Sequence, residues 1–132
     1  MPRVSAAFFA FGALCVFAGM LWGMEMGATE NFAVAPAHAH LNLLCWVTMA
    51  LYGTFYALTS KTMSPRLAWA NFLFSAAGGL ILIPTLAIYL SKGDKGMIPF
   101  MIAGEILTVF GLLTFLVSVL RELFRSRSVG VS

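Results

Sequence analysis

This chain of 132 residues is 61% hydrophobic and only 10% charged, whereas about a quarter of the residues of a typical soluble protein are charged. The composition excludes an ordinary soluble domain and indicates an integral membrane protein. The net charge of +3 does not indicate nucleic-acid binding, because the basic residues lie at the ends of apolar runs, where membrane topology explains them.

Four long apolar runs cover most of the chain, at about 4–27, 38–59, 67–90 and 97–120. Each run reaches the ~20 residues that a helix needs to cross about 30 Å of hydrocarbon. We therefore predict an all-α membrane protein in which residues 1–132 form one domain of four transmembrane helices. The sequence has no phosphate-binding glycine loop and no nucleophile triad, so any catalysis would depend on a cofactor.

The first run follows Arg3, and the segment Ala33-Val34-Ala35 after it resembles a signal-peptide cleavage site. Its apolar part is longer than the 7–15 residues usual in such signals, and we therefore predict a retained helix. Within this run Gly19, Gly23 and Gly27 recur every four residues. This spacing predicts a smooth strip on which another helix can pack closely.

The second run begins with His38 and His40, the only histidines of the chain. Ionisable residues in a membrane helix are functional candidates by default. Residues two apart on a helix project about 200° from one another, and zinc motifs instead place their histidines four apart. The spacing therefore favours two separate sites, one on each side of the helix, over a single chelated metal ion.

Mostly apolar walls surround both predicted histidine sites and favour a flat, apolar ligand. Helical spacing places Asn42 on the side of His38. Trp46 is interpreted either as an anchor at the membrane interface or as a wall of the ligand pocket. Cys15 and Cys45 lie within predicted spans and are interpreted as small packing groups, with no disulfide between them.

The loop between the last two runs, 91–96, contains Lys92 and Lys95. These lysines either pair with anionic groups of a ligand or are simply hydrated. Glu105 is the only acidic residue well inside a predicted span. It is interpreted either as a proton-handling carboxyl or as a protonated group in a hydrogen bond between helices.

The basic residues are distributed unequally between the two sides of the predicted membrane domain. One side has Arg3, Lys61, Arg66, Arg121, Arg125 and Arg127. The other has only Lys92 and Lys95. Because cytoplasmic loops are enriched in Lys and Arg, we expect both termini in the cytoplasm and the histidines near the outer face of a bacterial inner membrane.

Haem suits this pattern, because its iron accepts an axial imidazole on each face and its porphyrin requires wide apolar walls. Since His38 and His40 point apart, one chain would supply one ligand to each of two haems, and a second chain would complete each coordination. A ring of identical protomers meets this requirement, with His38 of one copy and His40 of the next on the same iron.

The segment His38-Ala39-His40-Leu41, on the second of four spans, resembles the paired-histidine helix of the catalytic subunits of haem-copper oxidases and nitric oxide reductases. In that family one histidine of the pair binds the low-spin haem and the other binds the active-site haem. The subunits have twelve spans in three arcs of four, so the resemblance implies a homotrimer of this chain. It also implies that Lys92 and Lys95 meet the haem propionates.

The family builds its copper centre from three further histidines, which this chain lacks. The leading hypothesis is therefore a membrane b-type haem protein, related to oxidase subunit I, that transfers or stores electrons without reducing oxygen at a binuclear centre. One alternative is a copper-binding or copper-transport protein that uses both histidines and the thioethers of Met20, Met24 and Met26. Others are an accessory subunit of a respiratory complex, or histidines that only bond to loop and solvent.

Overall fold

The computed structural model describes residues 1–125, and every regular element in this range is helical. Four helical segments are long and apolar enough to cross a membrane, which confirms the predicted all-α, four-span class. They are α1 (Arg3–Thr29), the second span Ala35–Leu58, α4 (Pro65–Lys92), and the fourth span Lys95–Leu123, which comprises η2 (Lys95–Met97) and α5 (Ile98–Leu123). Arg127, one of the basic residues used above for topology, lies outside the described residues.

The second span is one continuous rod built from three helical types. It begins as α2 (Ala35–His40), continues as the π-helix η1 (Leu41–Thr48) and ends as α3 (Met49–Leu58). Pro36 lies in the first turn of α2, where its missing N–H leaves no helical hydrogen bond unmade. Both histidines therefore lie in the last turn of α2, directly before the π-helix.

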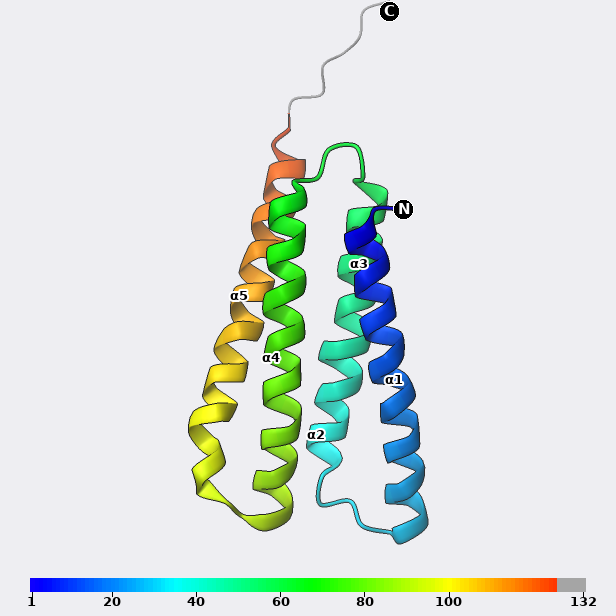
Figure 1. The fold of residues 1–132 in the computed structure, drawn as a ribbon, viewed down its shortest axis with the longest axis vertical. Coiled ribbons are helices and arrows are strands. Elements are labelled where there is room, and N and C mark those ends of the chain that lie inside the picture. The colour runs from blue at the N-terminus through cyan, green and yellow to red at the C-terminus, as the bar shows by residue number, and fades with distance from the viewer. Residues whose placement is uncertain (126–132) are drawn as a thin grey trace, which may run out of the picture.

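The spans alternate in direction and lie side by side (Figure 1). Helix α1 packs mainly on the second span, and α5 packs mainly on α4, while α4 also contacts the second span. The N-terminus, the loop after α3 and the end of α5 lie at one end of the molecule; the loops that follow α1 and α4 lie at the other (Figure 1). We call these the terminal end and the histidine end.

An aromatic core lies between the spans in the half of the molecule nearer the terminal end. Phe8 of α1 is fully buried, and its ring centroid is 5.8 Å from that of Tyr52, 5.7 Å from that of Tyr56 and 5.2 Å from that of Phe72. The first span is thus an integral part of the packed fold. These contacts tie α1, α3 and α4 together through aromatic rings, whose edge-to-face pairs stabilise beyond simple area burial.

A chain of hydrogen bonds crosses three helices beside this core. The Ser75 hydroxyl donates to Asn71 Oδ1 (3.0 Å), and Asn71 Nδ2 donates to the Tyr56 hydroxyl (3.2 Å). Ser118 donates its hydroxyl proton to the Thr114 carbonyl (3.0 Å), so Tyr56 is the donor in its 3.1 Å bond to Ser118 Oγ. Buried polar groups are thereby satisfied across α4, α3 and α5.

Glycines allow close approach along the α1 contact, as the four-residue spacing predicts. A Cβ at Gly23 would lie 3.2 Å from Cε1 of His38, and a Cβ at Gly19 would overlap Oδ1 of Asn42. The prediction is confirmed at these two positions. It is wrong at Gly27, where a Cβ would meet no atom of the described residues within 4 Å, because the second span ends before it reaches that turn of α1.

Candidate functional site

The backbone geometry changes directly after the two histidines. Residues Leu41–Thr48 form a π-helix, in which N–H groups bond to carbonyls five residues back. Helices of this type are rare and occur frequently at functional sites. The sequence LNLLCWVT contains no glycine or proline that could have indicated this departure from α-helical geometry.

His38 lies in the contact between α1 and the second span. Its Nε2 is 3.2 Å from Nδ2 of Asn42, and its ring centroid is 6.0 Å from that of Trp22, which approaches edge-on. Because the Asn42 amide nitrogen can only donate, Nε2 accepts in this bond and the proton of the neutral ring lies on Nδ1. The spacing prediction that Asn42 lies on the His38 side agrees with this contact.

Two polar atoms of the His38 and Asn42 side chains, which together we call the His38 niche, have no hydrogen-bond partner in residues 1–125. Nδ1 of His38 and Oδ1 of Asn42 are both buried and form no hydrogen bond within residues 1–125. A buried donor or acceptor without a partner costs about 1–3 kcal/mol. The niche around His38 therefore contains one unmatched donor and one unmatched acceptor within four residues of each other.

His40 has a different environment, as expected for a residue on the other side of the helix. It is exposed, and its Nδ1 is 2.7 Å from the carbonyl oxygen of Pro36. A carbonyl only accepts, so Nδ1 carries a proton, and in the neutral ring the lone pair then lies on Nε2. This backbone hydrogen bond is the arrangement that commonly fixes the tautomer of a metal-binding histidine.

The other predicted site residues are only partly brought together. Trp46 packs on α1, where a Cβ at Gly12 would lie 3.0 Å from Cε3 of its ring, so the indole borders the helix contact well inside the span. Lys92 and Lys95 are exposed in and beside the turn after α4, at the histidine end. Neither lysine forms an ion pair with a carboxylate of the described chain.

The three methionines proposed for copper do not share one environment. Met20 and Met24 are 64% and 71% exposed on α1, whereas Met26 is 5% exposed and belongs to the buried face. Nor does any group of three or more His, Cys, Asp or Glu side chains lie together in residues 1–125.

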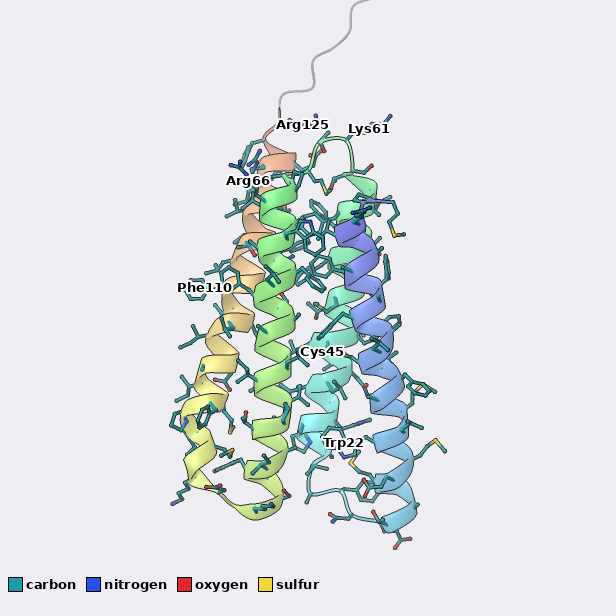
Figure 2. All side chains as sticks on the ribbon, in the orientation of Figure 1. Trp22, Cys45, Lys61, Arg66, Phe110 and Arg125 are labelled. Atoms are coloured by element: carbon teal, nitrogen blue, oxygen red, sulfur yellow. The ribbon has the colours of Figure 1, made fainter. Side chains whose placement is uncertain are left out.

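The sequence did not predict that the two cysteines lie next to each other in the middle of the membrane domain. Cys15 of α1 and Cys45 of η1 are neighbouring free thiols (Figure 2 labels Cys45). Cys45 is buried against α4, where a Cβ at Gly79 would overlap its Sγ. The two thiols are far apart in sequence, so no local motif could have indicated this proximity.

Glu105 is exposed on α5 and forms no hydrogen bond or ion pair with any residue that the structure describes. It lies seven residues after the start of α5, about 10 Å along the helix axis. A carboxyl at such a depth requires a partner, a proton or water. Residues 1–125 of the single chain supply no partner.

Comparison of the chain with protein-family models, curated proteins and solved structures finds no match. The chemistry of the site therefore rests on its own geometry: an oriented imidazole with a free lone pair on one side of the second span, and an incompletely bonded imidazole on the other.

Proposed function

We propose that this chain is the protomer of a homo-oligomeric membrane b-type haem protein that transfers or stores electrons. The observation that carries the proposal is the hydrogen bond from Nδ1 of His40 to the Pro36 carbonyl, which leaves Nε2 free and exposed. A neutral imidazole held in this way is prepared to bind iron.

The surroundings of His40 fit a porphyrin. Leu43, Val47 and Leu51 follow His40 at three-, seven- and eleven-residue intervals and are all exposed. They form an exposed apolar surface on the second span beyond the imidazole, which would provide the apolar wall that haem requires. The orientation of His40 and the exposed apolar residues after it support the His40 half of the bis-histidine proposal.

The His38 half requires a change of side-chain orientation. Nε2 of His38 is bonded to Asn42, while Nδ1 of His38 and Oδ1 of Asn42 lack partners. If the imidazole turned so that Nδ1–H donated to Oδ1 of Asn42, both atoms would be satisfied and Nε2 would be released. Asn42 would then orient His38 for iron as the Pro36 carbonyl orients His40.

Glu105 supports the oligomeric part of the proposal. Its carboxyl is exposed on α5 about 10 Å along the axis from the start of that helix, and His40 lies about 8 Å from the start of α2 at the same end of the molecule. Because a lone carboxyl is costly in hydrocarbon, a neighbouring protomer that covers this face would stabilise it. We propose a trimer, in line with the twelve-span arrangement that the resemblance implies.

Bound haem would supply one-electron chemistry through its iron. The residues of this chain would hold it: His40 and His38 from different copies would bind the iron, and the exposed apolar residues of η1 would exclude water. Lys92 and Lys95 lie at the histidine end and would offset the negative charge of the propionates. If His38 and His40 both bound the iron, the chain would have no further histidine, and we therefore expect no rapid binding of carbon monoxide to the reduced protein.

The direct test is the iron content and visible spectrum of the protein purified in mild detergent from cells supplied with a haem precursor. We expect one haem b per chain and the sharp reduced bands of bis-imidazole iron. A colourless protein that contains copper would favour the copper alternative, and a colourless protein without metal would favour an accessory subunit. Either result would contradict the proposal.

A further inference from the structure

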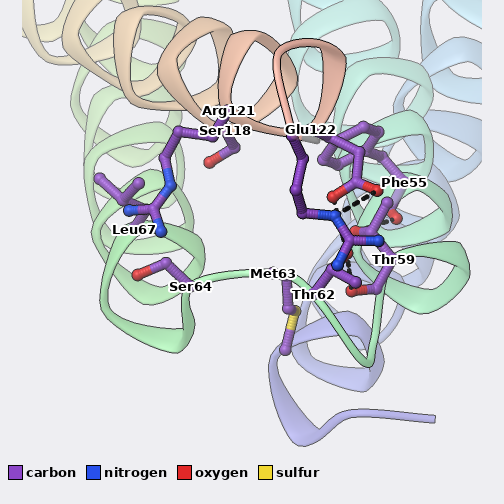
Figure 3. A pocket seen from close by; sticks show the side chains of 10 residues that line it. Phe55, Thr59, Thr62, Met63, Ser64, Leu67, Ser118, Arg121 and Glu122 are labelled. Atoms are coloured by element: carbon purple, nitrogen blue, oxygen red, sulfur yellow. Dashed lines mark hydrogen bonds and ion pairs between the residues drawn. The ribbon is translucent and has the colours of Figure 1, made fainter. Parts of the chain in front are cut away.

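A second site lies at the terminal end, where the second span, the loop after it and α5 enclose a cavity. The cavity has a volume of about 160 Å³, which is large enough for several water molecules or a small anion. Its lining includes the side chains of Thr62, Ser64, Arg121, Glu122 and Arg125. Figure 3 shows Arg121 extended toward Leu67 and Ser64, with Glu122 on the opposite side near Phe55 and Thr59.

Positive charge predominates in this cavity. Glu122 is the only carboxylate among the described residues that line the cavity, whereas Arg121 and Arg125 contribute two guanidinium groups. Its Oε2 accepts a 2.6 Å hydrogen bond from the Thr62 hydroxyl, and its Oε1 lies 3.6 Å from Nε of Arg125. The carboxylate thus links the loop after α3 to α5 through Thr62, and its 3.6 Å contact with Arg125 is an ion pair too long to be a hydrogen bond.

Arg121 has no counter-ion in the described chain. No carboxylate of residues 1–125 lies within 4.0 Å of its guanidinium, although the side chain lines the cavity. The Ser64 hydroxyl on the same side also makes no hydrogen bond there and does not cap α4. The cavity therefore combines a free guanidinium, a second guanidinium with unused donors and a free hydroxyl, all of which can donate to one anion.

The location of the cavity agrees with an anionic ligand. It lies where α3 and α5 end and α4 begins, at the end that also carries Lys61 and Arg66 (Figure 2). Helix ends lie at the level of the lipid headgroups, and clusters of basic residues there attract anionic lipids. Planar guanidinium groups bind phosphate through paired hydrogen bonds, which makes phosphate the best match among common anions.

We propose that this cavity binds a phosphate group through Arg121 and Arg125, carried either by an anionic phospholipid or by free phosphate. The proposal is independent of haem. Thr62 of the loop after α3 is already hydrogen-bonded to Glu122 of α5. A ligand bound in the cavity would further stabilise the contact between this loop and the end of α5.

The test uses the full-length protein in detergent and measures binding of phosphatidylglycerol, of phosphatidylcholine with the same acyl chains, and of inorganic phosphate. Arg121→Gln is the informative variant, because Arg121 holds no ion pair whose loss would disturb the fold. Lys61→Gln is its matched control, since it removes the same charge at the same end but lies outside the cavity lining. Arg125→Gln provides a second, independent variant.

We expect Arg121→Gln and Arg125→Gln each to weaken phosphatidylglycerol binding roughly tenfold, the effect of losing a charged hydrogen bond, while Lys61→Gln changes it by less than about twofold. Phosphatidylcholine should bind poorly to all forms. Arginine-dependent binding of inorganic phosphate alone would support the site and identify free phosphate as its source. Equal losses in Arg121→Gln and Lys61→Gln, or no loss in either arginine variant, would overturn the proposal.

Discussion

Replacing Tyr56 by Phe tests whether the hydrogen-bond chain between α3, α4 and α5 holds the membrane domain together. The substitution deletes only the hydroxyl, which accepts from Asn71 at 3.2 Å and donates to Ser118 at 3.1 Å. The ring remains and keeps its contact with Phe8, whose centroid is 5.7 Å away. Packing is therefore preserved while two bonds between helices are lost.

The expected decrease in the free energy of unfolding of Tyr56→Phe follows from the number of hydrogen bonds lost and from their burial. Hydrogen bonds between membrane helices contribute about 0.6 kcal/mol on average and about 1.7 kcal/mol at most, so two bonds amount to roughly 1–3 kcal/mol. Asn71 is fully buried, and its amide group would lose a partner that water cannot replace, which favours the upper part of this range.

The assay is equilibrium unfolding in mixed micelles of a mild and a denaturing detergent, followed by circular dichroism. Tyr52→Phe is the matched control, because Tyr52 is also buried on α3 and contacts Phe8, yet its hydroxyl makes no hydrogen bond with the described residues. We expect Tyr52→Phe to change the free energy of unfolding by less than about 0.5 kcal/mol. Equal destabilisation by the two substitutions would refute the reasoning.

Three further predictions concern the helix contact, the proposed propionate lysines and the proposed protomer interface. Gly19→Leu should destabilise the fold by more than about 2 kcal/mol in the same unfolding assay, because its side chain would collide with Asn42, whereas Gly27→Leu should be nearly neutral. Neutralising both Lys92 and Lys95 to Gln should lower the haem midpoint potential by roughly 10–40 mV without changing the spectrum, since nearby positive charge favours the reduced state; an unchanged potential would indicate hydrated lysines. Glu105→Leu should convert the oligomer to monomer in analytical ultracentrifugation, and an unaltered oligomer would exclude Glu105 from the interface.

The fold was predictable from the sequence because membrane spans depend on length and hydropathy alone. Four runs of sufficient length appear as four helices, with Ala35–Leu58 and Pro65–Lys92 beginning within three residues of the predicted positions. The opposite environments of His38 and His40 also follow from local geometry, because both residues lie in α2, where about 100° separates successive side chains.

The details of the site depend on contacts that no local pattern encodes. The bond between Tyr56 and Ser118 joins residues 62 positions apart, and Cys15 and Cys45 meet only because α1 packs on η1. The π-helix after His40 differs from an α-helix only in its backbone hydrogen bonds, and its apolar sequence contains no residue that indicates this difference. The orientation of His38 toward Asn42 depends on the glycines of α1, which leave room for both side chains.

The central claim, that each haem is shared between His38 of one copy and His40 of another, is tested most directly by the visible spectrum of the two single variants. We predict that His38→Ala and His40→Ala each abolish the reduced bis-imidazole bands in the purified homo-oligomer, because every iron would lose one of its two ligands. An intact bis-imidazole spectrum in either variant would contradict the claim.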